Sequence, residues 1–276
     1  MIIFEVYYGL RDDTFNKMID DGRLPESLRD FRQKYQVVYD IETLEKRPSE
    51  IDASSPDAIL NPVSIGCATN VPGVEDKWFC VKSSEPGEIQ TMVDEFMDYL
   101  MDVSKAYQSC VPIEIRDLLA DLRKKLAAKK QLPFNPQRTV LEQEINCLKK
   151  FESLPVYAFN GARFDLVVLM PYIAKWCGTD IEKDLIKRGA QYMMMNVDRI
   201  QFRDVLDFTA PTNLDKYLKT WNASEAKSIF PYSHFNSIED LESTIEFPSK
   251  EAFFNELKQV NFLFRVFFHI CLVSYQ

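Results

Sequence analysis

The stretch Val37-Val38-Tyr39-Asp40-Ile41-Glu42-Thr43 has the pattern of a β-strand that carries two carboxylates near its end. Because successive side chains of a strand alternate between its faces, Asp40 and Glu42 are expected on one face, about 7 Å apart along the strand. Two carboxylates so placed can share divalent metal ions. The spacing alone is not distinctive, since Asp180-Ile181-Glu182 repeats it. Only the segment at Asp40 follows a β-branched run, which would leave unpaired carboxylates at the end of a buried strand, a costly arrangement without a cation. From this segment alone, a metal-binding strand end and an ordinary exposed one are equally compatible with the pattern.

A second segment, LPVYAFNGARFDLVVL at residues 154–169, predicts a strand, a turn that contains glycine, and a helix that begins near Asp165. An acidic residue at a helix N-terminus is often there only because it interacts favourably with the helix dipole. This segment also offers the amide of Asn160, the ring of Phe164 and the carboxylate of Asp165 within one turn. An amide, a ring and a metal ligand together suit the binding of a nucleotide.

The rest of the chain predicts an α/β protein without repeats or low-complexity tracts. Strand-like runs lie at residues 36–41, 63–69, 78–81, 154–159 and 200–208, and an amphipathic helix is expected at residues 88–107. Residues 111–151 hold two more helical patterns, which we interpret as an insertion between two halves of a sheet. A basic run there, at residues 123–125 and 129–130, is interpreted as a solvated helix face.

Composition limits the possible functions. The chain has 276 residues and a net charge of −9, which argues against a broad basic surface for duplex DNA and leaves room only for a local nucleic-acid site. The six cysteines form no C-x-x-C pair, which indicates reduced thiols in an intracellular protein. The longest apolar run, at residues 262–273, is too short to span a membrane, so no membrane association is expected.

Taken together and in this order, the two motifs resemble the first two exonuclease motifs of family B DNA polymerases. The sequences YDIET and FNGARFDLVVL are similar to the corresponding motifs of the protein-primed members, especially those of Maverick or Polinton elements and their viral and linear-plasmid relatives. Residues 202–208 and 213–218 resemble the strand and helix that follow the second motif. The segment KSIFPY, at residues 227–232, is similar to a lysine-containing element of the same enzymes.

The resemblance implies a ribonuclease-H-like fold of the DEDD exonuclease kind, a mixed sheet flanked by helices. It covers residues 36–258, with the helical insertion at about 108–151. Residues 1–35 form an N-terminal segment of unknown role, and residues 259–276 form an apolar tail that is not expected to belong to the domain.

The resemblance also implies a role for individual residues. Asp40, Glu42 and Asp165 would bind two Mg²⁺ or Mn²⁺ ions, and Lys227 would assist catalysis or contact a phosphate. The single-stranded 3' end of DNA would be held by a set of five residues: Thr43, Tyr157, Asn160, Phe164 and Leu206. Val205 stands where the family has Ser or Thr, so a DNA contact is not expected there, and Asp204 is expected to orient the strand. A terminal priming protein is a further implied partner.

The chain departs from the family at its end. The family's third motif is a Tyr-x-x-x-Asp segment, and none lies downstream of Lys227. The sequence after residue 258 becomes apolar, as intron read-through or a frameshift would make it. We therefore expect the N-terminal proofreading-exonuclease portion of a polymerase, truncated before the third motif, with an incomplete metal site and weak or no activity. The alternatives are a non-catalytic module that binds single-stranded DNA or a priming protein, and a stand-alone metal-dependent 3'-5' nuclease. The compartment, whether nucleus, mitochondrion or viral replication site, stays open.

Overall fold

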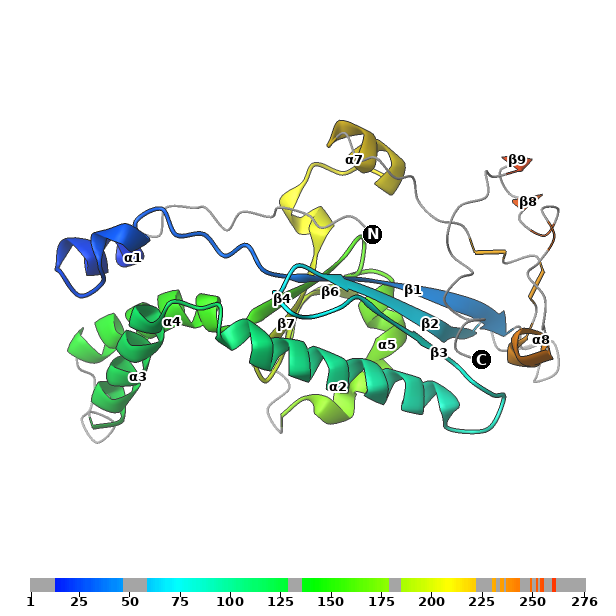
Figure 1. The fold of residues 1–276 in the computed structure, drawn as a ribbon, viewed down its shortest axis with the longest axis horizontal. Coiled ribbons are helices and arrows are strands. Elements are labelled where there is room, and N and C mark those ends of the chain that lie inside the picture. The colour runs from blue at the N-terminus through cyan, green and yellow to red at the C-terminus, as the bar shows by residue number, and fades with distance from the viewer. Residues whose placement is uncertain are drawn as a thin grey trace.

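The computed structural model describes residues 13–46, 59–128, 136–178 and 185–221 as continuous stretches. Beyond them it describes residues 230–231, 234–235, 237–243, 249, 252, 254–255 and 260–261. The fold is α/β and is built on a seven-stranded mixed sheet of strand order β3-β2-β1-β4-β7-β6-β5 (Figure 1). The expectation of a mixed sheet flanked by helices is confirmed.

The sheet has an antiparallel half and a parallel centre. The antiparallel half comprises β1 (Val37–Lys46), β2 (Ile59–Thr69) and β3 (Lys77–Cys80). The strands β4 (Leu154–Ala158) and β7 (Ile200–Asp204) run parallel to β1. The hairpin of β5 (Leu185–Arg188) and β6 (Gln191–Val197) pairs antiparallel with β7 and completes the sheet.

All five expected strand regions form strands, whereas the β5–β6 hairpin was not predicted. Most residues of this hairpin are only partly buried, so its sequence lacks the clear alternation of apolar and polar residues by which a half-buried strand is recognised. The last expected strand is also shorter than predicted. It ends at Asp204, and a 3-10 turn, η3 (Val205–Phe208), follows it.

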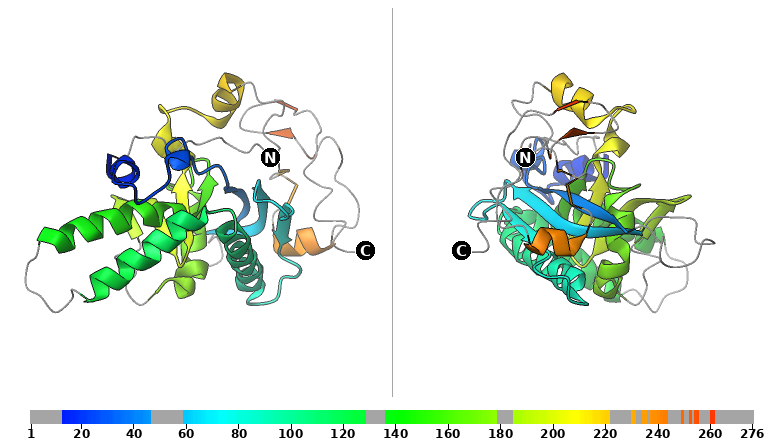
Figure 2. Two further views of the ribbon diagram at one scale, coloured as in Figure 1. Left: turned by 60° about the vertical axis from the view of Figure 1, so that its left-hand side comes forward. Right: turned by 90° about the vertical axis from the view of Figure 1, so that its right-hand side faces the viewer.

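Helices cover the two faces of the sheet unequally. The long helix α2 (Glu88–Gln108), which was predicted from its apolar periodicity, and α5 (Asp165–Ile173) pack together against the sheet on one face. The short helix α7 (Leu214–Thr220) lies on the opposite face (Figures 1 and 2). The expected insertion forms a helical hairpin of α3 (Ile113–Ala128) and α4 (Pro136–Glu152) that projects from one end of the sheet.

Smaller elements lie around this frame. They are α1 (Asp13–Asp20), η1 (Glu26–Leu28), η2 (Ala174–Trp176), α8 (Ile238–Ser243) and the two-residue strands β8 (Phe254–Asn255) and β9 (Val260–Asn261). In the part of the chain that the structure describes, no helix is both long enough and apolar enough to cross a bilayer.

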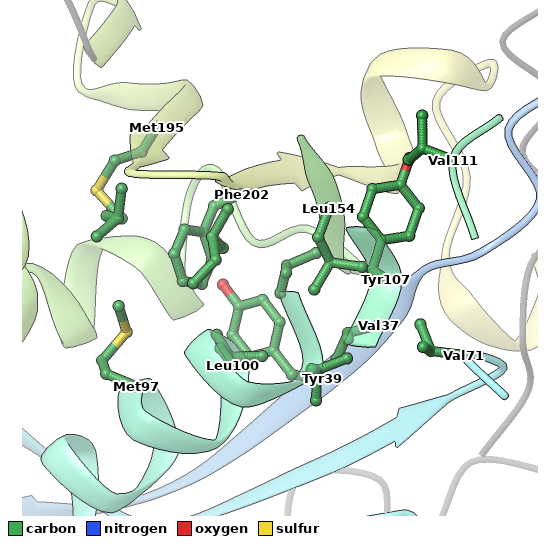
Figure 3. Close-up of a cluster of buried hydrophobic side chains, with 14 of the residues drawn as sticks. Val37, Tyr39, Val71, Met97, Leu100, Tyr107, Val111, Leu154, Met195 and Phe202 are labelled. Carbon is green, nitrogen blue, oxygen red and sulfur yellow. The ribbon is translucent and has the colours of Figure 1, made fainter. Parts of the chain in front are cut away.

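One continuous hydrophobic core lies between the sheet and the helices α2 and α5, and we call this side the closed face. Tyr39 is at its centre, with ring centroids 5.7 Å from Phe96 of α2 and 5.9 Å from Phe202 of β7. Figure 3 shows the Tyr39 ring among apolar side chains that include Met97, Leu100 and Phe202. Phe15 and Met18 of α1 belong to the same core, so the chain N-terminal to β1 contributes to it.

The opposite side, which we call the open face, has two small apolar clusters instead of a core. One consists of Val38, Tyr157, Val205, Tyr217 and Leu218, and the other of Leu44, Val63, Phe230 and Phe235. The first lies under α7 and the second near the far end of β1. Their separation leaves room for polar side chains between them.

Two bidentate ion pairs fix the helical hairpin. Arg23 donates to both carboxylate oxygens of Glu144 on α4, at 2.6 and 2.9 Å, and Arg123 of α3 donates to both oxygens of Glu152, at 3.0 and 2.7 Å. Lys125 pairs with Asp121 at 2.7 Å. Within the described part of the basic run, therefore, Arg123 and Lys125 are engaged with carboxylates of the protein itself.

Candidate functional site

Asp40 and Glu42 lie on the open face, between its two apolar clusters. Tyr39 belongs to the core of the closed face, while Val38 and Leu44 belong to the two clusters of the open face. Alternation along β1 therefore places the two carboxylates on the side of Val38 and Leu44. Asp40 is exposed, whereas Glu42 is only 5% exposed. The predicted common face of the two carboxylates thus follows from the burial of their neighbours.

A β-bulge lies beside Glu42. Glu42 pairs with Ser64 of β2 and the next residue, Thr43, pairs with Pro62, so Val63 is the additional residue. Proline has no N–H to donate to a sheet and is tolerated at such irregular positions. Because bulges bend a strand and change the direction of nearby side chains, they are common next to functional sites. Thr43 itself is 6% exposed.

The second motif is positioned where β4 separates from β1. These strands pair only through Val37 with Val156 and Val38 with Tyr157, and β4 ends at Ala158. Beyond this point the backbone N–H of Ile41 forms a hydrogen bond with the carboxylate of Asp165, the first residue of α5. The side chain of Asp165 therefore takes a place that a longer β4 would fill, and it is brought close to Asp40.

The turn between β4 and α5 depends on its Asn-Gly pair. Asn160 has φ of 65°, in the left-handed region, which asparagine tolerates better than most residues. A Cβ on Gly161 would lie 2.7 Å from the Cβ of Ala158, too close for any other residue without a shift of the backbone. The sequence Asn-Gly is thus what allows β4 to turn directly into α5.

Asp204, the last residue of β7, holds this turn. Its carboxylate accepts hydrogen bonds from the backbone N–H groups of Asn160 at 2.9 Å, Ala162 at 3.0 Å and Leu206 at 2.9 Å. It is 2% exposed. Asp204 was expected to orient the strand, and in the structure its carboxylate orients the turn that follows β4. With three N–H donors already around it, the carboxylate has little capacity left to bind a metal ion.

Asp165 is the electrostatically unusual group of the site. It is 2% exposed, and its Oδ1 has no hydrogen-bond partner in the described part of the chain. Burial, and then the negative charge of Asp40, raise the pKa of Asp165 well above its ordinary value. A buried carboxylate with an unsatisfied oxygen is costly unless a cation or a proton compensates it. A divalent cation next to Asp40 and Asp165 fits this requirement.

The residues expected to hold DNA differ in their accessibility. Tyr157 is fully buried, with its ring centroid 6.1 Å from that of Phe208, while Asn160, Phe164 and Leu206 are partly exposed. The structure therefore brings Asn160 and Phe164 to the same turn as Asp165 and leaves them accessible.

Lys227 lies outside the described residues. Phe230, three positions later, is described and packs in one cluster with Leu44 and Val63. Leu44 follows Glu42 at the next position on the same face of β1. Phe230 therefore lies near the end of the strand that carries the first two carboxylates.

The carboxylates of the site that could hold a metal ion are those of Asp40, Glu42 and Asp165. Among the residues that the structure describes, no group of three or more His, Cys, Asp or Glu side chains is close enough together to hold a metal ion. Asp40 and Asp165 approach each other, and Glu42 lies two positions further along β1. Oxygen ligands of this kind suit Mg²⁺ or Mn²⁺.

Two features of the site were not found from the sequence. The first is the set of three backbone hydrogen bonds to Asp204, because a strand-end aspartate gives no sign of its hydrogen-bond partners. The second is the exposed ring of Phe208, with the guanidinium carbon of Arg203 5.8 Å from its centroid. Its signal was an aromatic residue at the end of a segment that was expected to be a strand, a weak signal by itself.

Comparison with known proteins gives no relative from which a function can be transferred. No protein-family model, no curated protein and no solved structure matches the chain. Any functional assignment therefore depends on the geometry of the site and on the resemblance of its motifs.

Proposed function

We propose that the chain is a 3'-to-5' exonuclease-type domain of the kind found in protein-primed family B DNA polymerases. In this proposal the edge of the sheet at Asp40 and Asp165 receives the 3' end of single-stranded DNA. One observation carries the proposal: two carboxylates from motifs far apart in the sequence meet beyond the carboxyl end of β4, and one of them is buried with an unsatisfied oxygen. In α/β sheets, ligands commonly bind outside the carboxyl ends of parallel strands.

The topology supports the fold part of the proposal. The strand order β3-β2-β1-β4-β7, with β1 to β3 antiparallel and with β4 and β7 parallel to β1, is compatible with a ribonuclease-H-like core. In this order the first motif lies on β1, and the second lies on the turn and helix after β4. The β5–β6 hairpin is then an addition at one edge.

The residues of the site have distinct tasks in this proposal. Asp40 and Asp165, with Glu42 on the same strand as Asp40, would hold Mg²⁺ or Mn²⁺. When bound, such ions activate water and stabilise the leaving 3' oxygen of a phosphodiester. Asp165 binds a cation only when it is deprotonated, so its raised pKa opposes cation binding at low pH and a bound cation lowers that pKa again.

The turn would bind the terminal nucleotides. Asp204 holds the backbone at Asn160 and Ala162, and this fixes the partly exposed ring of Phe164 beside Asp165. A ring that is fixed before binding loses little conformational entropy when a base stacks on it. Phe230 packs against Leu44 near the end of β1. Lys227, three positions before Phe230 in the sequence, would add a positive charge for a phosphate.

A second candidate function is a non-catalytic module that binds single-stranded DNA or a priming protein. Two observations favour it. The first is that no group of three metal-binding side chains is assembled among the described residues. The second is that the buried carboxylate of Asp204 already accepts hydrogen bonds from three backbone N–H groups. A poorly fixed second metal ion would leave DNA binding intact and slow the reaction a hundredfold or more.

One experiment separates these functions. The purified chain is incubated with a 3'-labelled or 5'-labelled single-stranded oligonucleotide and Mn²⁺ or Mg²⁺, beside Asp40→Ala. Trimming from the 3' end that disappears in Asp40→Ala supports the nuclease, and binding without trimming supports the module. If the chain neither binds nor trims the oligonucleotide, the nuclease and a module that binds single-stranded DNA are both wrong, and a module that binds a priming protein is left.

A further inference from the structure

The open face carries a group of aromatic rings that the proposed site does not use. Phe159 and Tyr217 have ring centroids 5.6 Å apart, and Tyr217 and Trp221 have centroids 6.1 Å apart. Phe208 lies beside them, 6.1 Å from Tyr157, which belongs to the same small cluster as Tyr217. We call Phe159, Phe208, Tyr217 and Trp221 the aromatic strip.

The strip is accessible at its outer members. Trp221 is 68% exposed and Phe208 is 44% exposed, whereas Tyr217 is 7% exposed and supports them from below. Large aromatic side chains usually bury most of their area in a folded protein, so two exposed rings on one small region require an explanation. Packing in the hydrophobic core does not explain Trp221 and Phe208, because both rings are exposed.

The strip is continuous with the candidate site. Phe159 directly precedes Asn160, the residue at which β4 turns towards α5, and it packs against the cluster that contains Val38 and Tyr157. Val38 precedes Asp40 by two positions on β1 and shares its face. A ligand that leaves the Asp40–Asp165 edge over the open face therefore meets Phe159 first and Trp221 beyond it.

The charge around the strip is more positive than that of the chain as a whole. Arg203 has its guanidinium carbon 5.8 Å from the Phe208 centroid, and Lys216 and Lys219 are exposed on α7. The carboxylates of the same segments are those of Asp204, Asp207 and Asp215. Three cations thus accompany three carboxylates here, while the complete chain has 33 basic and 42 acidic residues.

We propose that the aromatic strip is a binding path for single-stranded nucleic acid, along which bases upstream of the 3' end stack on the way to the Asp40–Asp165 edge. Exposed rings next to arginine and lysine are the usual means by which proteins hold single strands without sequence preference, because every base has a face that can stack. This inference rests on the proposed function and extends it from the terminal nucleotides to the strand behind them.

The test measures the affinity of Trp221→Leu for two oligothymidylates, one of about 4 and one of about 12 nucleotides, by fluorescence anisotropy. Val140→Ala is the control, because Val140 is 48% exposed on α4, in the helical hairpin that projects from one end of the sheet. Since α7 keeps its buried residues Tyr217 and Leu218 in Trp221→Leu, we expect the variant to fold, which circular dichroism verifies.

We expect Trp221→Leu to bind the longer strand about fivefold to a hundredfold more weakly, the cost of one lost stacking ring. The shorter strand should be affected much less, and Val140→Ala should bind both as the wild type does. Equal affinity of wild type and Trp221→Leu for the longer strand, while Phe164→Leu weakens both strands, would overturn the strip alone and leave a protein as its occupant. Failure of the wild type to bind either strand would overturn the proposed function as well.

Discussion

The two faces of the sheet are built for different purposes. The closed face has one continuous core, in which the rings of Tyr39, Phe96 of α2 and Phe202 make tilted and edge-to-face contacts. The open face has two small clusters with the carboxylates of Asp40 and Glu42 between them. The residues that carry stability and those that carry the proposed chemistry therefore alternate along one strand, β1. Substitutions on the two faces should separate stability from ligand binding.

The largest effect is expected in the core of the closed face. Phe202→Ala removes a fully buried ring and should lower the free energy of unfolding by about 3–5 kcal/mol. Phe208→Ala, the matched change on the open face, should lower it by less than about 1 kcal/mol, because that ring is 44% exposed. Urea denaturation measures both. Equal losses of stability would contradict the distinction between the faces.

The next effect concerns the link between the faces. Asp204→Ala leaves the N–H groups of Asn160, Ala162 and Leu206 without their acceptor and should cost about 2–3 kcal/mol in unfolding free energy. It should also weaken binding of single-stranded DNA, because the turn loses its support. The control Asp207→Asn changes an exposed carboxylate nearby. A fully stable Asp204→Ala would show that water replaces the carboxylate.

At the turn between β4 and α5 the expected effect is on binding. Phe164→Leu keeps apolar packing at the start of α5 but removes the ring, so affinity for single-stranded DNA should fall by about 1–3 kcal/mol with little change in stability. Val167→Ala, at an exposed position of the same helix, is the matched control. Unchanged binding by Phe164→Leu in a fluorescence titration would remove Phe164 from the site.

The smallest effect is a slope in the pH dependence of stability. The pKa of Asp165 is raised in the folded state by burial and by Asp40, above its unfolded value of about 3.9. As pH rises from this unfolded value to the raised one, the folded protein retains a proton that the unfolded chain has lost. The free energy of unfolding should therefore fall, by at most about 1.4 kcal/mol per pH unit. Asp165→Asn should remove this slope, and an unchanged slope would assign it to another group.

Parts of this arrangement could be predicted from the sequence because they depend on local patterns. The apolar periodicity of residues 88–107 and the start of a helix at Asp165 both correspond to elements of the structure. The common face of Asp40 and Glu42 follows from period-two alternation alone. These features need only neighbours in the sequence.

Other parts depend on contacts between distant segments. That Asp165 reaches the N–H of Ile41 follows from the early end of β4, and no local pattern encodes the length of a strand relative to its partner. The three hydrogen bonds to Asp204 likewise join two strands and a turn. The β5–β6 hairpin was missed because edge strands of intermediate burial have no regular apolar pattern.

The central claim is that Asp40 and Asp165 together bind a divalent cation, and Mn²⁺ titration tests it most directly. The signal of free Mn²⁺ in electron paramagnetic resonance decreases when the ion binds to protein, so it is measured with the wild type, Asp40→Asn, Asp165→Asn and the control Asp207→Asn. The account predicts that the wild type and Asp207→Asn bind Mn²⁺ at pH 7.5 and more weakly at pH 5, and that Asp40→Asn and Asp165→Asn lose most of this binding. Equal Mn²⁺ binding by all four proteins would contradict it.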